Sequence, residues 1–172
     1  MTDLISYMNL KSWLDEQGVT LVAVSKTKSV DEIRRVHALG QRVFGENRAR
    51  ELEEKQPELP GDIQWHMIGH LQSNKVKYIA PFISMIESVD SIKLLDRIDR
   101  EAAKADRQID VLLQVRIAEE ETKYGFAPDD LRHAAADLAS DARPHVRIRG
   151  LMGMASFVEN TEKERGEFDM HK

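Results

Sequence analysis

The chain has 172 residues, 41% of them hydrophobic and 32% charged, which is ordinary for one globular domain. Its formal net charge of -5 gives no reason to expect a nucleic-acid partner or binding to an anionic membrane. It contains no cysteine, which excludes disulfides, thiolate metal sites and cysteine nucleophiles and fits a cytoplasmic protein.

The N-terminal segment lacks the features of a signal peptide, because Asp3 stands where a basic residue is expected and the apolar residues are spaced. No apolar run approaches the roughly 20 residues that a membrane span needs. Apolar residues at roughly helical spacing instead predict an amphipathic helix over residues 3–16, which Gly18 ends.

Six short strands, each followed by a helix, are predicted after this first helix. The strands cover residues 21–25, 42–44, 63–68, 83–89, 109–115 and 145–151. The helices cover residues 30–39, 48–55, 72–80 and 91–105, and two more begin after Pro128 and at Thr161. Ser29, with Glu32 three residues later, forms a capping box before the second helix. This alternation favours one α/β domain over residues 1–172, either a doubly wound open sheet or a β/α barrel.

Lys26 is the strongest candidate for a functional residue in this pattern. Val22, Val24 and Lys26 share one face of the first strand, so the lysine extends an apolar face at the carboxyl end of that strand. An amine that loses hydration gives up its proton more readily, and its neutral form attacks carbonyl carbons. If the strand continues, Lys28 lies on the same face and its charge adds to this effect. The alternative is a lysine that simply reaches water at the end of a strand.

His66 and His70 do not match a metal-binding motif. The helical HExxH pattern has glutamate after the first histidine, where this chain has Met67. On a strand, positions four apart are separated by roughly 13 Å, which is too far to share one ion. His66 shares a strand face with Gln64 and Ile68, so it either points into a pocket or is a half-buried histidine with local partners.

Two glycine-containing segments follow or end strands, at residues 45–47 and 150–154. Glycines allow a ligand to approach the backbone closely, and they also simply form turns. Neither segment matches a phosphate-binding motif. The acidic run Glu119 to Glu121 is expected to be a solvated loop or helix start.

Six stretches occur in the order, and near the spacing, that one protein family shows. They are AVSKTK at 23–28, FGENR at 44–48, WHMIGHLQSNK at 65–75, SVDS at 88–91, EETKYGF at 120–126 and GLMGMA at 150–155. From about residue 17 onward, the chain closely resembles the YggS/PROSC family of pyridoxal phosphate homeostasis proteins.

The resemblance implies a TIM-type β/α barrel, similar to the N-terminal domain of alanine racemase, and so favours the barrel over the open sheet. It implies that pyridoxal 5'-phosphate (PLP) is held as a Schiff base on Lys26, with Asn47, His66 and Met152 near the cofactor. It further implies a cytoplasmic PLP carrier and regulator of vitamin B6 pools without established catalytic turnover, with apo PLP-dependent enzymes as partners. The alternatives are a racemase-like enzyme and a degenerate interaction protein without PLP.

A full β/α barrel has eight strands, and six are predicted here. In the family, a later segment carries an SMGMS-like motif and a GS...VRIG segment, which supply much of the phosphate cup and an arginine facing the pyridine nitrogen. Neither motif occurs in this sequence. We therefore expect an incomplete barrel of about six βα units with weak retention of the phosphate. A truncated sequence is the favoured explanation, beside completion by a second copy and a degenerate family member.

Overall fold

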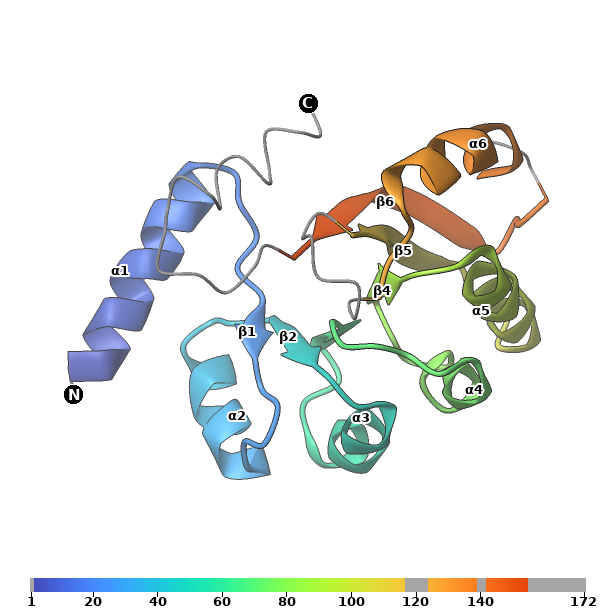
Figure 1. The fold of residues 1–172 in the computed structure, drawn as a ribbon. Coiled ribbons are helices and arrows are strands. Elements are labelled where there is room, and N and C mark those ends of the chain that lie inside the picture. Colours follow the sequence, from blue (N-terminus) through green and yellow to red (C-terminus); the bar gives the residue numbers. More distant parts are fainter. Residues whose placement is uncertain (1, 117–123, 139–141, 155–172) are drawn as a thin grey trace.

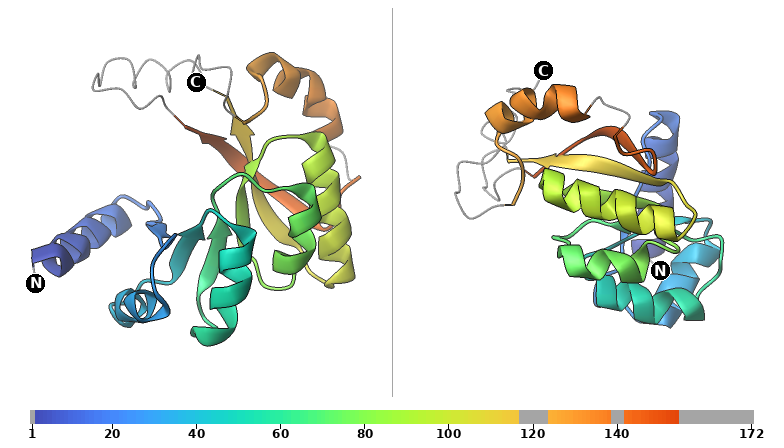
Figure 2. Two further views of the ribbon diagram at one scale, coloured as in Figure 1. Left: turned by 60° about the horizontal axis from the view of Figure 1, so that its bottom comes forward. Right: turned by 90° about the vertical axis from the view of Figure 1, so that its right-hand side faces the viewer.

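A computed structural model of the chain describes residues 2–116, 124–138 and 142–154. The described residues form one six-stranded parallel sheet in the order β1-β2-β3-β4-β5-β6 (Figures 1 and 2). The strands are β1 Ala23–Val24, β2 Val43–Glu46, β3 Gln64–Met67, β4 Met85–Val89, β5 Ile109–Val115 and β6 Val146–Gly153. The helices are α1 Thr2–Glu16, α2 Val30–Ala38, α3 Ala49–Lys55, α4 Val76–Ile79, α5 Ile92–Lys104 and α6 Pro128–Leu138, with short 3-10 helices η1 Gln56–Glu58 and η2 Ser73–Lys75.

The strand order distinguishes between the two folds that the sequence left open. Each strand pairs with the strand that precedes it in the chain, as in a β/α barrel, whereas the order reverses within a doubly wound sheet. The predicted fold class, with six βα units of a barrel, is therefore confirmed. The predicted helix at Thr161 and the acidic run Glu119 to Glu121 lie outside the described residues.

Serine side chains cap the N-termini of two of the helices. At α2 the Glu32 N–H donates to Ser29 Oγ at 3.3 Å, and Glu32 Oε2 accepts from the Ser29 N–H at 2.8 Å. This is the predicted capping box, which satisfies backbone groups that the first turn leaves free. At α5, Ser91 Oγ accepts from the Leu94 N–H. Ser91 is thus the N-cap of α5.

The sheet has an outer face that helices α2 to α5 cover and an inner face that they leave open (Figure 1). Side chains alternate between the faces, so the outer face carries the apolar core. Core residues on the strands are Phe44, Trp65, Met67, Ile86, Ile109, Val111 and Leu113. One row across the inner face follows from the register: Val24, Gly45, His66, Met85, Asp110 and Arg147.

Several element boundaries differ from the sequence prediction. The first strand shrinks to two residues, because the chain turns at Lys26 and Thr27. β2 continues to Glu46, where the sequence predicted a turn after Phe44. The predicted helix over 72–80 begins as a 3-10 turn and has only four α-helical residues. The first difference matters for the site, since it ends the alternation that was expected to align Lys28 with Lys26.

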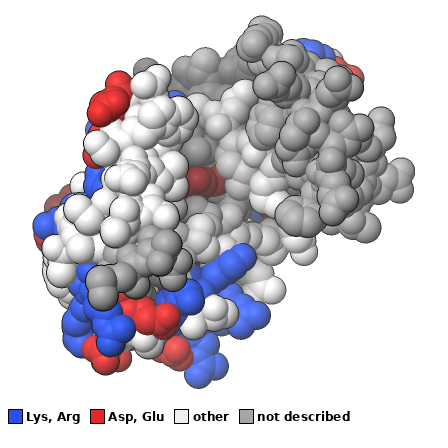
Figure 3. Space-filling view, turned by 90° about the vertical axis from the view of Figure 1, so that its left-hand side faces the viewer, with Lys and Arg blue, Asp and Glu red and all other residues white. Residues whose placement is uncertain are grey.

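Helix α1 forms as predicted, but its apolar side chains are not buried against the described residues. Ile5, Met8 and Trp13 are each more than half exposed. Figure 3 shows the side of the molecule where α1 and α2 lie, with many Lys, Arg, Asp and Glu side chains gathered at the bottom of the view and uncharged side chains over much of its upper left. The helix is tied to the sheet by Tyr7, whose hydroxyl donates to Gln41 Oε1 at 2.9 Å. Within the described residues, no helix has the length and apolar character needed to cross a bilayer.

Candidate cofactor-binding site

Lys26 lies in the turn that directly follows β1, at the carboxyl end of that strand. The Ser25 N–H still donates to Gly45 O at 2.9 Å, and the Lys28 N–H donates to Ser25 O at 3.0 Å, which closes the turn. The Lys26 side chain is exposed, and no described residue forms a hydrogen bond or ion pair with its ammonium group. The fold therefore presents a free primary amine at the edge where β/α barrels carry their active sites.

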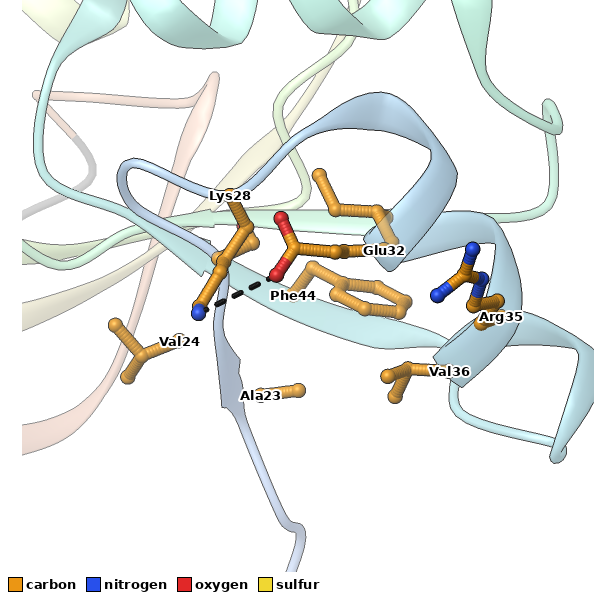
Figure 4. A pocket seen from close by; sticks show the side chains of 9 residues that line it. Ala23, Val24, Lys28, Glu32, Arg35, Val36 and Phe44 are labelled. Atoms are coloured by element: carbon orange, nitrogen blue, oxygen red, sulfur yellow. Dashed lines mark hydrogen bonds and ion pairs between the residues drawn. The ribbon is translucent and has the colours of Figure 1, made fainter. Parts of the chain in front are cut away.

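Lys28 does not share the environment of Lys26, because β1 ends at Val24 and the condition for both lysines to lie on one face is not met. Its ammonium pairs with Glu32 Oε1 at 3.4 Å. Both side chains line a groove of about 490 Å³ between β1 and α2 (Figure 4). The groove also contains Val36 and Phe44, which belong to the outer, helix-covered side. The charge of Lys28 is thus compensated locally, in a groove that Lys26 does not line.

The inner face around Gly45, beside β1, carries apolar side chains. A Cβ atom on Gly45 would lie 2.9 Å from Ile68 Cδ1 and 3.0 Å from Val22 Cγ1. The space above Gly45 is therefore bordered by apolar side chains from the segment before β1 and the segment after β3. The result is an apolar floor on the inner face.

His66 has a local partner, which was one of the two interpretations that the sequence left open. It is 8% exposed, and its Nδ1 lies 2.6 Å from Glu87 Oε1 on the neighbouring strand. A carboxylate at Nδ1 fixes the orientation of the ring and leaves Nε2 as the second polar atom. Because Nε2 has no hydrogen bond to a described residue, His66 is both locally satisfied and able to contact a ligand on the inner face.

Asn47 is held at the end of β2 by a contact that only glycine permits. A Cβ atom on Gly69 would lie 2.6 Å from Asn47 O and 2.8 Å from Asn47 Cα. Gly69 O in turn accepts from Ser88 Oγ at 2.6 Å. The segments that follow β2 and β3 are therefore fixed against each other and against Ser88 of β4, and Asn47 is placed one residue beyond β2.

The four predicted site residues fall into two groups. Lys26 and Asn47 follow β1 and β2, and His66 lies on β3; these three strands are neighbours in the sheet. Met152 lies on β6, in register with Gln114, at the carboxyl end of the last described strand. The structure thus brings three of them to adjoining strands and the fourth to the other end of the strand order. Their contact with a cofactor stays a prediction.

A cluster at the carboxyl edge was not anticipated from sequence. His70 Nδ1 lies 3.0 Å from Asp90 Oδ2, and its ring stacks on Tyr124 with 3.7 Å between ring centroids. These residues follow β3, β4 and β5, so only the folded sheet brings them together. The two histidines therefore have separate carboxylate partners. Within the described ranges, no group of three or more His, Cys, Asp or Glu residues is arranged to hold a metal ion.

Residues 7–171 match the family model described as "Alanine racemase, N-terminal domain". A pyridoxal phosphate homeostasis protein of Pasteurella multocida is 34% identical over 162 residues, which cover 91% of this chain and 68% of that protein. The structure of PipY of Synechococcus elongatus without PLP has a TM-score of 0.85 at 38% identity, covering 94% of this chain and 76% of PipY.

The same protein with PLP bound has a TM-score of 0.78 and 38% identity, covering 88% of this chain and 70% of PipY. An alanine racemase of Clostridium difficile has a TM-score of 0.74 at 15% identity, covering 96% of this chain and 44% of the racemase. At that identity, the likeness to the racemase shows a shared fold alone.

Proposed function

Because this chain belongs to the family of pyridoxal phosphate homeostasis proteins, we propose that it binds PLP and helps to maintain vitamin B6 pools in the cytoplasm. PipY, which is 38% identical, has been solved with PLP bound. The proposed role is that of a carrier without catalytic turnover, and apo forms of PLP-dependent enzymes are the proposed recipients. PLP supplies an aldehyde carbon that bonds reversibly to amines, which suits a cargo that must be released.

Lys26 is the proposed covalent anchor. Its Nζ would hold the cofactor through a Schiff base to the aldehyde carbon, a condensation that releases the aldehyde oxygen as water. The observation that carries this assignment is the free, exposed amine at the carboxyl end of β1. Lys28 is a poorer candidate because its ammonium is paired with Glu32 on the outer side of the strand.

The remaining proposed contacts come from Asn47, His66 and Met152. His66 offers Nε2, with its ring oriented by Glu87. Asn47 offers a carboxamide from a backbone position that Gly69 fixes, and Met152 offers an apolar thioether. The apolar floor of the inner face suits the plane of a pyridine ring, so these residues fit PLP in character.

The test is to titrate the purified chain with PLP, record the visible absorbance of a Schiff base, reduce it with borohydride and map the modified lysine by mass spectrometry. Lys26→Ala is expected to abolish both signals. The matched control is Lys28→Ala, which removes a lysine two positions away and is expected to keep both. Reduction at Lys28, or unchanged absorbance in Lys26→Ala, contradicts the assignment of the anchor.

A further inference from the structure

Resting on the proposed function, we propose that a buried ion-pair network behind β1 and β2 positions Lys26 by holding the residues on both sides of it. The network consists of Ser25, Glu46, Glu51 and Lys55, and it is called the Lys55 network below. It contains no group on the inner face, so its members are positioning residues and not contacts of the cofactor.

The centre of the Lys55 network is a charged pair with almost no access to water. Glu46 is fully buried and Lys55 is 9% exposed. Lys55 Nζ donates to Glu46 Oε1 at 2.7 Å, and Ser25 Oγ donates to the same oxygen at 2.7 Å. Glu46 Oε2 has no hydrogen-bond partner among the described residues. Desolvating two charges offsets most of their attraction, so such a pair is poor evidence for stability alone.

Both neighbours of Lys26 in the chain are bonded to this network. On one side, Lys55 Nζ donates to Ser25 O at 2.9 Å, the same oxygen that accepts from the Lys28 N–H. On the other side, the Thr27 N–H donates to Glu51 Oε1 at 2.9 Å. Glu51 Oε1 also lies 3.3 Å from Lys55 Nζ, which closes the network around the turn. Lys26 thus keeps a side chain without a hydrogen bond or ion pair to any described residue, while the backbone on both sides of it is fixed.

The network lies on the opposite side of the sheet from the proposed cofactor face. Glu46 alternates with Gly45, whose missing side chain faces Val22 and Ile68 on the inner face. Glu46 therefore points outward, toward the helix α3 that supplies Lys55. A group in this position influences a ligand on the inner face only through the backbone that carries Lys26.

The backbone at Thr27 supplies an independent observation. Its φ angle is 63°, in the left-handed region that β-branched residues rarely adopt. Such conformations persist only where the surroundings hold them, and they cluster at functional sites. The hydrogen bond to Glu51 holds this one. Partial burial raises the pKa of Glu51, but the Thr27 N–H and the charge of Lys55 outweigh that effect, so its pKa lies below the ordinary value and the acceptor stays ionised.

The experiment compares Glu51→Ala with Glu54→Ala in the full chain. Both changes remove a glutamate from α3, so their effect on helix propensity is the same. Glu54 pairs with Arg50 on the surface and does not contact the turn. Hydrogen exchange of the Thr27 and Lys28 amides is measured by NMR, which needs no cofactor. Capture of PLP at Lys26 is then timed by borohydride trapping, at a temperature where far-UV circular dichroism shows every variant folded.

We expect the Thr27 amide to exchange roughly tenfold faster in Glu51→Ala than in Glu54→Ala, because it loses a hydrogen bond to a charged acceptor. Capture of PLP at Lys26 is expected to slow several-fold in Glu51→Ala alone. Equal amide protection in the two variants overturns the positioning role whether or not PLP is bound. Faster exchange with unchanged capture overturns it as well. Failure of the wild-type chain to form a bond at Lys26 overturns the proposed function instead. The exchange data separate the two failures, because they are measured without PLP.

Discussion

Removing the ammonium of Lys55 should destabilise the chain more than any surface charge does. In Lys55→Met, the fully buried carboxylate of Glu46 loses its cation and keeps only the Ser25 hydroxyl as a donor. Breaking a buried pair in this way costs about 3–5 kcal/mol. With a urea m-value of about 2 kcal/mol/M, the unfolding midpoint falls by roughly 2 M. Since domains of this kind have a total stability of about 5–15 kcal/mol, the loss is a large fraction of it.

The double variant Glu46→Leu with Lys55→Met removes both charges and should recover most of this loss, because apolar replacements of buried pairs are often neutral. Urea unfolding followed by circular dichroism measures both variants. The control is Lys104→Met, which removes a mostly exposed partner of Glu101 and should cost about 0–1 kcal/mol. A Lys55→Met midpoint that matches this control, or a double variant no more stable than the single one, refutes the buried pair.

Three further predictions follow from other contacts. Gly69→Ala places a Cβ 2.6 Å from Asn47 O and should cost about 1–3 kcal/mol, measured by thermal unfolding; an unchanged Tm contradicts the contact. Thr27→Gly should relieve the strain of the positive φ and so keep or raise the unfolding midpoint, but it should slow PLP capture at Lys26. Thr27→Asn should retain the rate of capture. Faster capture in the glycine variant counts against a positioning role. A hydrogen bond from His37 lowers the pKa of Asp62, so its stabilisation is present above pH ~4 and is lost as pH falls through the lower folded pKa. The midpoint difference between wild type and Asp62→Asn should therefore shrink below that pH, and a difference that grows on acidification contradicts the sign.

Local patterns in the sequence were enough for much of the fold. The strand at 109–115 matches β5, because its β-rich residues are bounded by polar segments. The capping box at Ser29 was likewise predictable, since its two hydrogen bonds join residues that are three positions apart in the sequence. Periodicity did not predict the strand order, and only the order of the six family motifs along the chain indicated the barrel.

The contacts around Lys26 could not be predicted from local sequence patterns. The sequence placed Glu46 in a glycine-containing segment after a strand and Lys55 at the end of a polar helix. Neither assignment predicts burial, since charged residues are seldom fully buried. Their burial depends on contacts among residues 25, 46, 51 and 55, which come from three separate segments. The hydrophobic periodicity of a helix or a strand does not predict contacts between separate segments. The same limit applied to Lys28, since a turn with positive φ at a threonine has no signature in the sequence.

The shortness of β1 gives a physical reason why Lys26, as the proposed anchor, would need the Lys55 network behind it. In the described sheet, β1 lies at one end of the strand order and has only two residues in register with β2. A ladder of that length restrains the following turn weakly, because few backbone hydrogen bonds hold it. A covalent anchor requires an amine held at a defined place, while its side chain must stay free to react. Bonds from the outer side to Ser25 and Thr27 satisfy both demands, since they fix the backbone and leave the inner face to the ligand.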